Sequence, residues 1–156
     1  MIILDGDLLD VRRGIIIHQS NSCGSMGAGI AKVIRHKWPI VYVKYMDLCH
    51  SKQAKDLLGT TQLVNVASDL YVANLFGQLD YGRDKQKYTD YVAVGKALAH
   101  LKQQILSGLF PSAMASGVDV YCPFHMGCGL AGGDWEVYRA LLANIFPEIT
   151  VYKLPS

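Results

Sequence analysis

The stretch from Gly14 to Lys37, GIIIHQSNSCGSMGAGIAKVIRHK, constrains the fold more than any other part of the chain. An apolar run over Ile15–Ile17 predicts a buried strand that ends at His18. A polar, glycine-rich loop follows through Gly29, and helical spacing returns at Ile30, Val33 and Ile34. Such a junction leaves unpaired backbone N–H groups at a helix N-terminus, where the helix dipole favours an anion. We therefore expect a phosphate-bearing small molecule to bind there.

A second glycine loop lies near the end of the chain. Val118–Cys122 predicts a strand, Gly127–Gly133 a glycine loop, and Asp134 the N-cap of a following helix. Because the ends of strands in an α/β sheet gather on one crevice, two such loops would suit a diphosphate. Gly127–Gly132 also matches G-x-G-x-x-G, so a nicotinamide-dependent oxidoreductase is a competing interpretation. It is disfavoured because Glu148, the candidate ribose ligand, precedes the last strand instead of ending it.

The remaining elements predict one α/β domain over residues 1–156, with three α/β/α layers and a mixed sheet. Strands are expected at Ile2–Leu4 and Ile149–Leu154, and a hairpin at Thr61–Ala67 and Leu70–Phe76. Thr89 or Asp90 can cap a long helix, which a linker of small residues follows at 111–117. At 156 residues and 51% hydrophobic composition, the chain is large enough for one such core.

Charge and cysteine usage exclude several classes of protein. A net charge of +2 and a pI of about 8.3 are too mild for a surface that binds specific nucleic acid sequences. No apolar run approaches the roughly 18 residues of a membrane span, and the first residues lack the pattern of a signal peptide. The four cysteines show no zinc spacing, so we expect free thiols, no metal and a cytoplasmic location. A zinc deaminase is disfavoured because its signatures are missing.

The polar candidates each have a structural alternative. A histidine at a strand end, such as His18, is more often a hydrogen-bonded core residue than a catalytic one. The same two interpretations apply to His125 beside the second loop. Asn21 is as compatible with a turn as with a ribose contact. For Asp7, which follows a glycine at a strand end, a role in a turn is the default interpretation. A hydrolase that uses Cys23 or Cys128 as nucleophile would need a base, and the spacing identifies none.

Taken together, these motifs resemble those of the macrodomain family. The resemblance rests on Gly6-Asp7-Leu8, on His18 to Ala31 with its Met26–Ala31 loop, on Gly127–Leu130 and on Val151–Leu154, in that order along nearly the whole chain. It is closest to the branch that holds terminal ADP-ribose protein glycohydrolase and the ADP-ribose 1″-phosphate phosphatases. The resemblance implies a sheet of roughly six strands, ADP-ribose or a derivative as ligand, and no cofactor.

The resemblance also implies a role for each matching residue. Asp7 would accept a hydrogen bond from the adenine amino group beside Leu8, and Tyr152 and Leu154 would flank the adenine. Asn21 would contact the distal ribose, and His18 matches a histidine of this branch. We expect His18 or Asn21 to orient the attacking water. The first phosphate loop would consist of Met26, Gly27, Ala28, Gly29 and Ile30, and the second of His125, Met126, Gly127, Cys128, Gly129, Leu130 and Ala131.

Two departures from the glycohydrolase pattern bear on the activity. Ala131 stands where the glycohydrolase has an aspartate, and Asn74-Leu75-Phe76 lacks its lysine. Asp134 could replace the aspartate only if the loop folds back. We therefore expect removal of phosphate from ADP-ribose 1″-phosphate. The alternatives are hydrolysis of an ADP-ribosyl or acyl ester, with ADP-ribosylated proteins as candidate partners, and a reader that binds ADP-ribose without chemistry.

Overall fold

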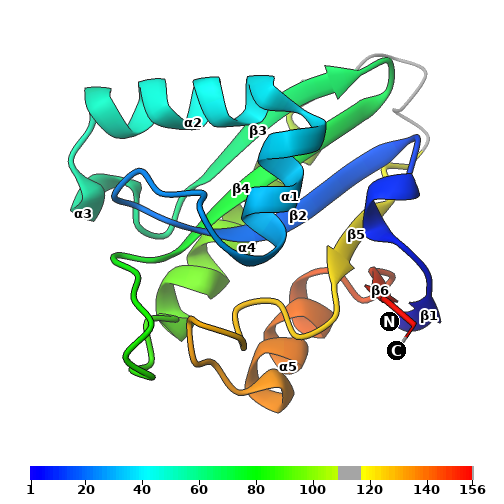
Figure 1. Cartoon of the computed structure of the whole chain (residues 1–156). Helices are drawn as coiled ribbons and strands as arrows, with labels where there is room; N and C mark the ends of the chain where they lie inside the picture. Colours follow the sequence, from blue (N-terminus) through cyan, green and yellow to red (C-terminus); the bar gives the residue numbers. More distant parts are fainter. Residues whose placement is uncertain (109–116, 156) are drawn as a thin grey trace.

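The computed structural model describes residues 1–108 and 117–155 (Figure 1). The linker expected at 111–117 lies outside these residues except for Gly117. The elements, in chain order, are β1 (Ile2–Asp5), the 3-10 turn η1 (Leu8–Asp10), β2 (Gly14–Asn21), α1 (Gly29–Lys37), α2 (Pro39–Ser51), α3 (Ala54–Leu57), β3 (Thr61–Ala67), β4 (Leu70–Gln78), α4 (Tyr91–Leu106), β5 (Val120–Pro123), α5 (Trp135–Ile145) and β6 (Thr150–Lys153).

A six-stranded mixed sheet in the order β1-β6-β5-β2-β4-β3 forms the middle layer. All neighbouring strands run parallel except β3 and β4, which form the expected antiparallel hairpin. Helices α1 to α3 cover one face of the sheet, and α4 and α5 cover the other (Figure 1). The prediction of a three-layer α/β/α fold with a mixed sheet is confirmed.

The core is divided by β2, all eight residues of which are buried. Ile15 and Ile17 point into the cluster under α4 and α5, whereas Ile16 points into the cluster under α1 and α2. This alternation follows from the two-residue period of a strand. A strand buried on both faces needs the continuous apolar run that begins at Ile15.

The prediction that this strand ends at His18 is wrong. β2 continues through Gln19 and Ser20 to Asn21, because each of these residues pairs in parallel with β4. Their polar side chains tolerate burial in part through hydrogen bonds, such as those from Gln19 to Gln78 and Thr89. The glycine-rich loop is correspondingly shorter.

The helix caps follow local sequence rules. Asp90, and not Thr89, caps α4, since its carboxylate accepts a hydrogen bond from the N–H of Ala93 at 3.0 Å. Asp134 caps α5, as expected, and accepts from the N–H of Glu136 at 2.9 Å. In the described part of the chain, no helix has the length and hydrophobicity needed to cross a membrane.

The sheet order arranges the segments that follow the parallel strands along one edge. From one end to the other come residues 6–13 after β1, the chain end after β6, residues 124–134 after β5, residues 22–28 after β2, and residues 79–90 after β4. Both glycine loops therefore lie side by side in the middle of this edge.

Candidate functional site

A cavity of about 720 Å³ opens at this edge of the sheet. Four segments line it. They are residues 19–21 at the end of β2, residues 25–31 except Met26, residues 78 and 81–83 at and after the end of β4, and residues 123–131. Cavities of this size hold ligands as large as a nucleotide. The two glycine loops predicted from the sequence thus meet in one concave site.

The first loop delivers an uncapped helix N-terminus to the cavity. Ala28 occupies the N-cap position of α1 and offers no side-chain acceptor, and Lys32 is the first residue to donate a helical hydrogen bond, to the Ala28 carbonyl at 3.3 Å. Among the described residues, nothing accepts from the backbone N–H groups of Gly29, Ile30 and Ala31. These groups and the helix dipole favour an anion in the cavity.

Asn21 fixes the shape of the first loop. Its Oδ1 accepts from the backbone N–H groups of Cys23 and Ser25, each at 3.2 Å, and from the Tyr45 hydroxyl at 2.7 Å. Its Nδ2 donates to the Ser25 carbonyl at 2.7 Å. An amide nitrogen carries two hydrogens, so one N–H of Asn21 is left for a ligand. Asn21 therefore has the turn role that its sequence position allowed, and its contact with a ligand stays a prediction.

The second loop is held by its own backbone. The N–H groups of Cys128 and Gly132 donate to the carbonyls of His125 and Gly129, each at 3.0 Å. Gly127 has φ of +73°, and a Cβ there would lie 2.4 Å from Cε2 of Tyr138, so only glycine fits. Within the described ranges, the N–H groups of Gly129, Leu130 and Ala131 have no acceptor. These three residues also line the cavity, so it has a second set of unpaired backbone donors in its wall.

A buried network beneath the second loop ties it to the sheet. Oε1 of Gln19 accepts from the Tyr138 hydroxyl at 2.8 Å, and Nε2 donates to Gln78 at 2.8 Å and to Thr89 at 2.9 Å. Thr89 in turn donates to the Gly127 carbonyl at 2.7 Å. Because buried polar groups that satisfy one another rigidify their surroundings, this network holds the second loop in place.

The residues expected beside an adenine do not line the cavity, although Tyr152 contacts its wall. Asp7 is exposed and caps η1, accepting from the N–H of Leu9 at 2.9 Å. Tyr152 stacks on Tyr121, with ring centroids 6.0 Å apart, and its carbonyl accepts from the N–H of Phe124, a residue of the cavity wall, at 2.9 Å. Leu154 is 64% exposed. These residues form the end of the edge made by β1 and β6.

His18, Leu8 and Met26 lie in the interior of the protein. Leu8 and Met26 belong to the core under α1 and α2. His18 is fully buried, outside the cavity lining, and Nε2 lies 2.6 Å from Oδ1 of Asn74. Burial outweighs this hydrogen bond and lowers the pKa of His18 to about 4. The geometry thus gives no support to direct contact between His18 and a substrate.

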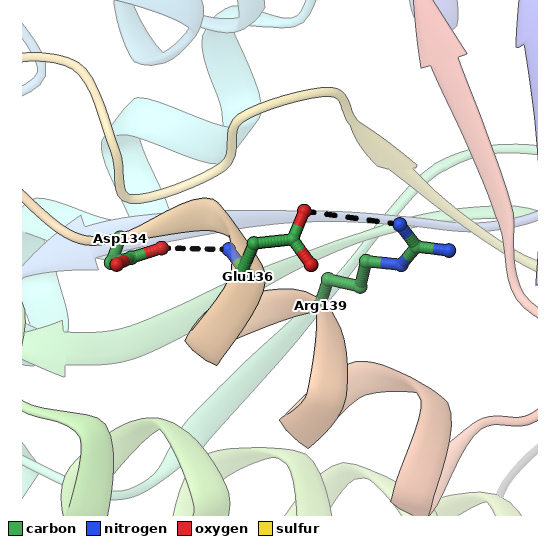
Figure 2. A network of polar contacts seen from close by, with 3 residues as sticks. All are labelled: Asp134, Glu136 and Arg139. Atoms are coloured by element: carbon green, nitrogen blue, oxygen red, sulfur yellow. Dashed lines mark hydrogen bonds and ion pairs between the residues drawn. The ribbon is translucent and has the colours of Figure 1, made fainter.

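Asp134 also has a structural role, as the N-cap of α5. Figure 2 shows its carboxylate directed to the N–H of Glu136, whose own carboxylate lies 3.9 Å from Arg139. Asp134 is not in the cavity lining. The loop does not fold back to place this carboxylate where the glycohydrolase aspartate would stand.

The cysteine thiols lack the properties of a nucleophile. All four cysteines are free, and Cys128 lines the cavity. Burial is the largest cause that raises the pKa of Cys23 and of Cys128 to about 11, so both remain protonated at neutral pH. Across residues 1–108 and 117–155, no group of three or more His, Cys, Asp or Glu side chains could hold a metal ion.

Several cavity residues escaped the sequence analysis: Gln19, Ser20, Gln78, Tyr81, Gly82, Arg83, Pro123 and Phe124. Four of them, Gln78, Tyr81, Gly82 and Arg83, end or follow β4, which precedes neither glycine loop. Gln78 to Arg83 reach the cavity because β4 pairs in parallel with β2 and the carboxyl ends of neighbouring parallel strands share one edge, and no local sequence signal shows this pairing.

Known proteins resemble the chain over most of its length. No protein-family model matches it. An ADP-ribose 1″-phosphate phosphatase of Meyerozyma guilliermondii is 30% identical over an alignment of 169 positions that covers 97% of each chain. Another protein of that name, from Lodderomyces elongisporus, is 31% identical over 84% of this chain and 80% of its own.

The fold has counterparts among solved structures. A macrodomain protein from Streptomyces coelicolor superposes with a TM-score of 0.75 at 25% identity, covering 99% of this chain and 98% of its own. Sequence relatives and fold agree with the resemblance read from the motifs. The chain therefore belongs to the macrodomain family, in the branch that contains the ADP-ribose 1″-phosphate phosphatases.

Proposed function

We propose that this protein binds ADP-ribose 1″-phosphate and hydrolyses its terminal phosphate. The observation that carries the proposal is the cavity in which the uncapped N-terminus of α1 faces the free N–H groups of the second glycine loop. Backbone donors on both sides can hold a diphosphate without a lysine or arginine between them. The relatives named as phosphatases of this compound support the choice of substrate.

The strand order suggests how the ligand lies. Asp7 and Tyr152 follow or end β1 and β6 at one end of the edge, so the adenine would bind there. The diphosphate would lie between the glycine loops that follow β5 and β2. The distal ribose would then reach Asn21 and the segment after β4.

The reaction needs few groups from the protein. A water molecule attacks the phosphorus atom, the bond between phosphorus and the oxygen on C1″ breaks, and ADP-ribose and inorganic phosphate leave. Asn21 lines the cavity and keeps one N–H for the distal ribose or for the attacking water. Because His18 does not reach the cavity, we assign it to the support of this strand end and not to contact with the water.

The other hydrolytic activities have weaker support. A lysyl adduct with the ribose would need a lysine, and neither a lysine nor a carboxylate lines the cavity among the described residues. Hydrolysis of an ADP-ribosyl or acyl ester at the same cavity, and binding without chemistry, remain as outcomes of the test. We further propose that residues 1–156 act as one domain in the cytoplasm, where the four free thiols would stay reduced.

The test compares substrates on the purified protein. Phosphate release from ADP-ribose 1″-phosphate would be followed beside ADP-ribose release from an ADP-ribosylated protein, with calorimetry of ADP-ribose binding in parallel. The proposal expects phosphate release and little or no ADP-ribose release. Binding of ADP-ribose with neither activity would make the protein a reader, and activity on the modified protein alone would make it an ester hydrolase.

A further inference from the structure

We infer that Arg83 is the specificity-determining residue that holds the terminal phosphate and so distinguishes ADP-ribose 1″-phosphate from ADP-ribose. The inference rests on the proposed function and adds a residue that the glycine loops do not include. Three independent features of Arg83 support it, namely its place along the sheet edge, its charge and the lack of an internal partner.

The place of Arg83 follows from the topology. Arg83 lines the cavity in the segment that follows β4, together with Tyr81 and Gly82. In the order β1-β6-β5-β2-β4-β3, this segment lies across both glycine loops from Asp7 and Tyr152. A ligand whose adenine binds at the β1 and β6 end therefore brings its far end to Arg83.

The charge of Arg83 is isolated within the cavity. Among the described residues that line it, Arg83 carries the one fixed charge, and none is acidic. The backbone N–H groups of the loops suffice for a diphosphate that is common to substrate and product. A phosphomonoester adds up to two further negative charges, which a guanidinium binds through paired, charge-assisted hydrogen bonds.

The carboxylates that flank Arg83 are engaged elsewhere. Asp84 accepts from the Tyr88 hydroxyl at 2.5 Å and from Nε2 of Gln86 at 2.8 Å. Asp80 accepts from the N–H of Tyr81 at 2.8 Å. Within the described part of the chain, no ion pair or hydrogen bond occupies the Arg83 guanidinium. It is therefore available to a ligand without first breaking an internal contact.

The test uses a graded series with a matched control. Arg83→Gln removes the charge, Arg83→Lys keeps the charge without the paired geometry, and Lys85→Gln makes the same charge change two residues away, outside the cavity lining. Each variant would be assayed for kcat and KM in phosphate release and, by calorimetry, for the Kd of ADP-ribose.

We expect Arg83→Gln to lower kcat/KM for ADP-ribose 1″-phosphate by about 10- to 100-fold, as for loss of a charged hydrogen bond. Arg83→Lys should lie in between, Lys85→Gln should resemble the wild type, and the Kd of ADP-ribose should change less than about threefold in all variants.

Two results would overturn the inference while leaving the proposed function intact. The first is an unchanged kcat/KM in Arg83→Gln. The second is an equal loss of affinity for substrate and ADP-ribose, which would place Arg83 on the diphosphate. A wild-type protein that binds ADP-ribose but releases no phosphate would instead refute the proposed activity, and the role of Arg83 with it.

Discussion

Nε2 of His18 lies 2.6 Å from Oδ1 of Asn74, and this contact fixes the tautomer of a fully buried histidine. Nδ2 of Asn74 donates to Oε1 of Gln62 at 3.0 Å, so the oxygen of Asn74 is the atom that faces His18 and accepts a hydrogen bond from its Nε2–H. Nδ1 of His18 is buried without a partner. The ring is therefore neutral, with its proton on Nε2.

The neutral state of His18 predicts how stability depends on pH. Burial lowers the pKa of His18 from 6.5 to about 4. Between these two pH values His18 is protonated in the unfolded chain and neutral in the folded protein. The contribution of His18 to the free energy of unfolding is fully present above pH 6.5 and is lost as the pH falls toward 4. The total loss is on the order of 3 kcal/mol.

Thermal unfolding between pH 4 and 7 checks this prediction. His18→Gln keeps a donor for Asn74 but does not titrate, so its stability should fall less steeply with acid than that of the wild type. His50→Gln, at an exposed histidine, is the control and should retain the wild-type slope. Equal slopes in wild type and His18→Gln would show that His18 titrates normally.

Two buried serines near the end of β2 should respond to alanine in opposite directions. Oγ of Ser20 is buried without a hydrogen-bond partner, whereas Oγ of Ser22 donates to the Gln78 carbonyl at 2.9 Å. An unpaired buried hydroxyl costs about 1 kcal/mol or more, and a made hydrogen bond contributes about 1 kcal/mol. Ser20→Ala should therefore raise the free energy of unfolding by about 1 kcal/mol, and Ser22→Ala should lower it by a similar amount.

Urea unfolding of the two serine variants, with m-values compared, gives both changes. A loss of stability in Ser20→Ala as large as that in Ser22→Ala would mean that the Ser20 hydroxyl has a partner in solution, such as a bound water.

Gly29 should accept a small neutral side chain and reject an acidic one. It has φ of +57°, and a Cβ there would meet no atom within 4 Å, so the space is that of the empty cavity. Asparagine tolerates this backbone conformation, while other residues pay roughly 1–2 kcal/mol. Gly29→Glu would also put a negative charge beside the free N–H groups that should hold a phosphate.

We expect Gly29→Glu to weaken ADP-ribose binding by more than tenfold, and Gly29→Asn to weaken it by a smaller factor. Calorimetry on variants that circular dichroism shows to be folded provides the measurement. Normal ADP-ribose binding by folded Gly29→Glu would place the diphosphate away from α1.

Local signals made much of this site predictable. The glycine spacing around Gly29 and Gly127 and the cap at Asp134 depend on residues next to one another in the chain, so a single sequence reveals them. The segment around Gln78 and Arg83 reaches the cavity only because β4 pairs with β2. Such non-local pairing leaves no mark on the residues themselves.

The orientation of His18 was equally beyond local reasoning. Alternating residues of a strand face opposite sides, so the side that a residue faces depends on where the strand starts and on irregularities such as the register shift between Ser20 and Asn21. The sequence reveals the strand from Ile15 to His18 but not that Gln19, Ser20 and Asn21 extend it. His18 therefore has the position of a core residue, while Asn21 reaches the cavity.

Asn21 should be the residue of this strand whose loss most affects turnover. Asn21→Ala removes the N–H that we propose for the ligand, and with it the acceptor that orders Cys23, Ser25 and Tyr45. We predict a fall in kcat for ADP-ribose 1″-phosphate of roughly ten- to a thousandfold, or about 1.4–4 kcal/mol of barrier. Asn21→Asp keeps the acceptor for Cys23, Ser25 and Tyr45 but loses both N–H groups, the one on the Ser25 carbonyl and the one left over for a ligand.

Steady-state kinetics of Asn21→Ala, Asn21→Asp and His18→Gln, with ADP-ribose Kd values from calorimetry, test this assignment. If Asn21 contacts the substrate directly, both Asn21 variants should have a lower kcat. His18→Gln should keep a kcat within about threefold of the wild type, because His18 does not line the cavity. If Asn21→Asp keeps full turnover, Asn21 acts only by shaping the loop. If His18→Gln loses turnover as Asn21→Ala does while binding ADP-ribose normally, the buried ring takes part in the chemistry and its position at rest is not the one in which it acts.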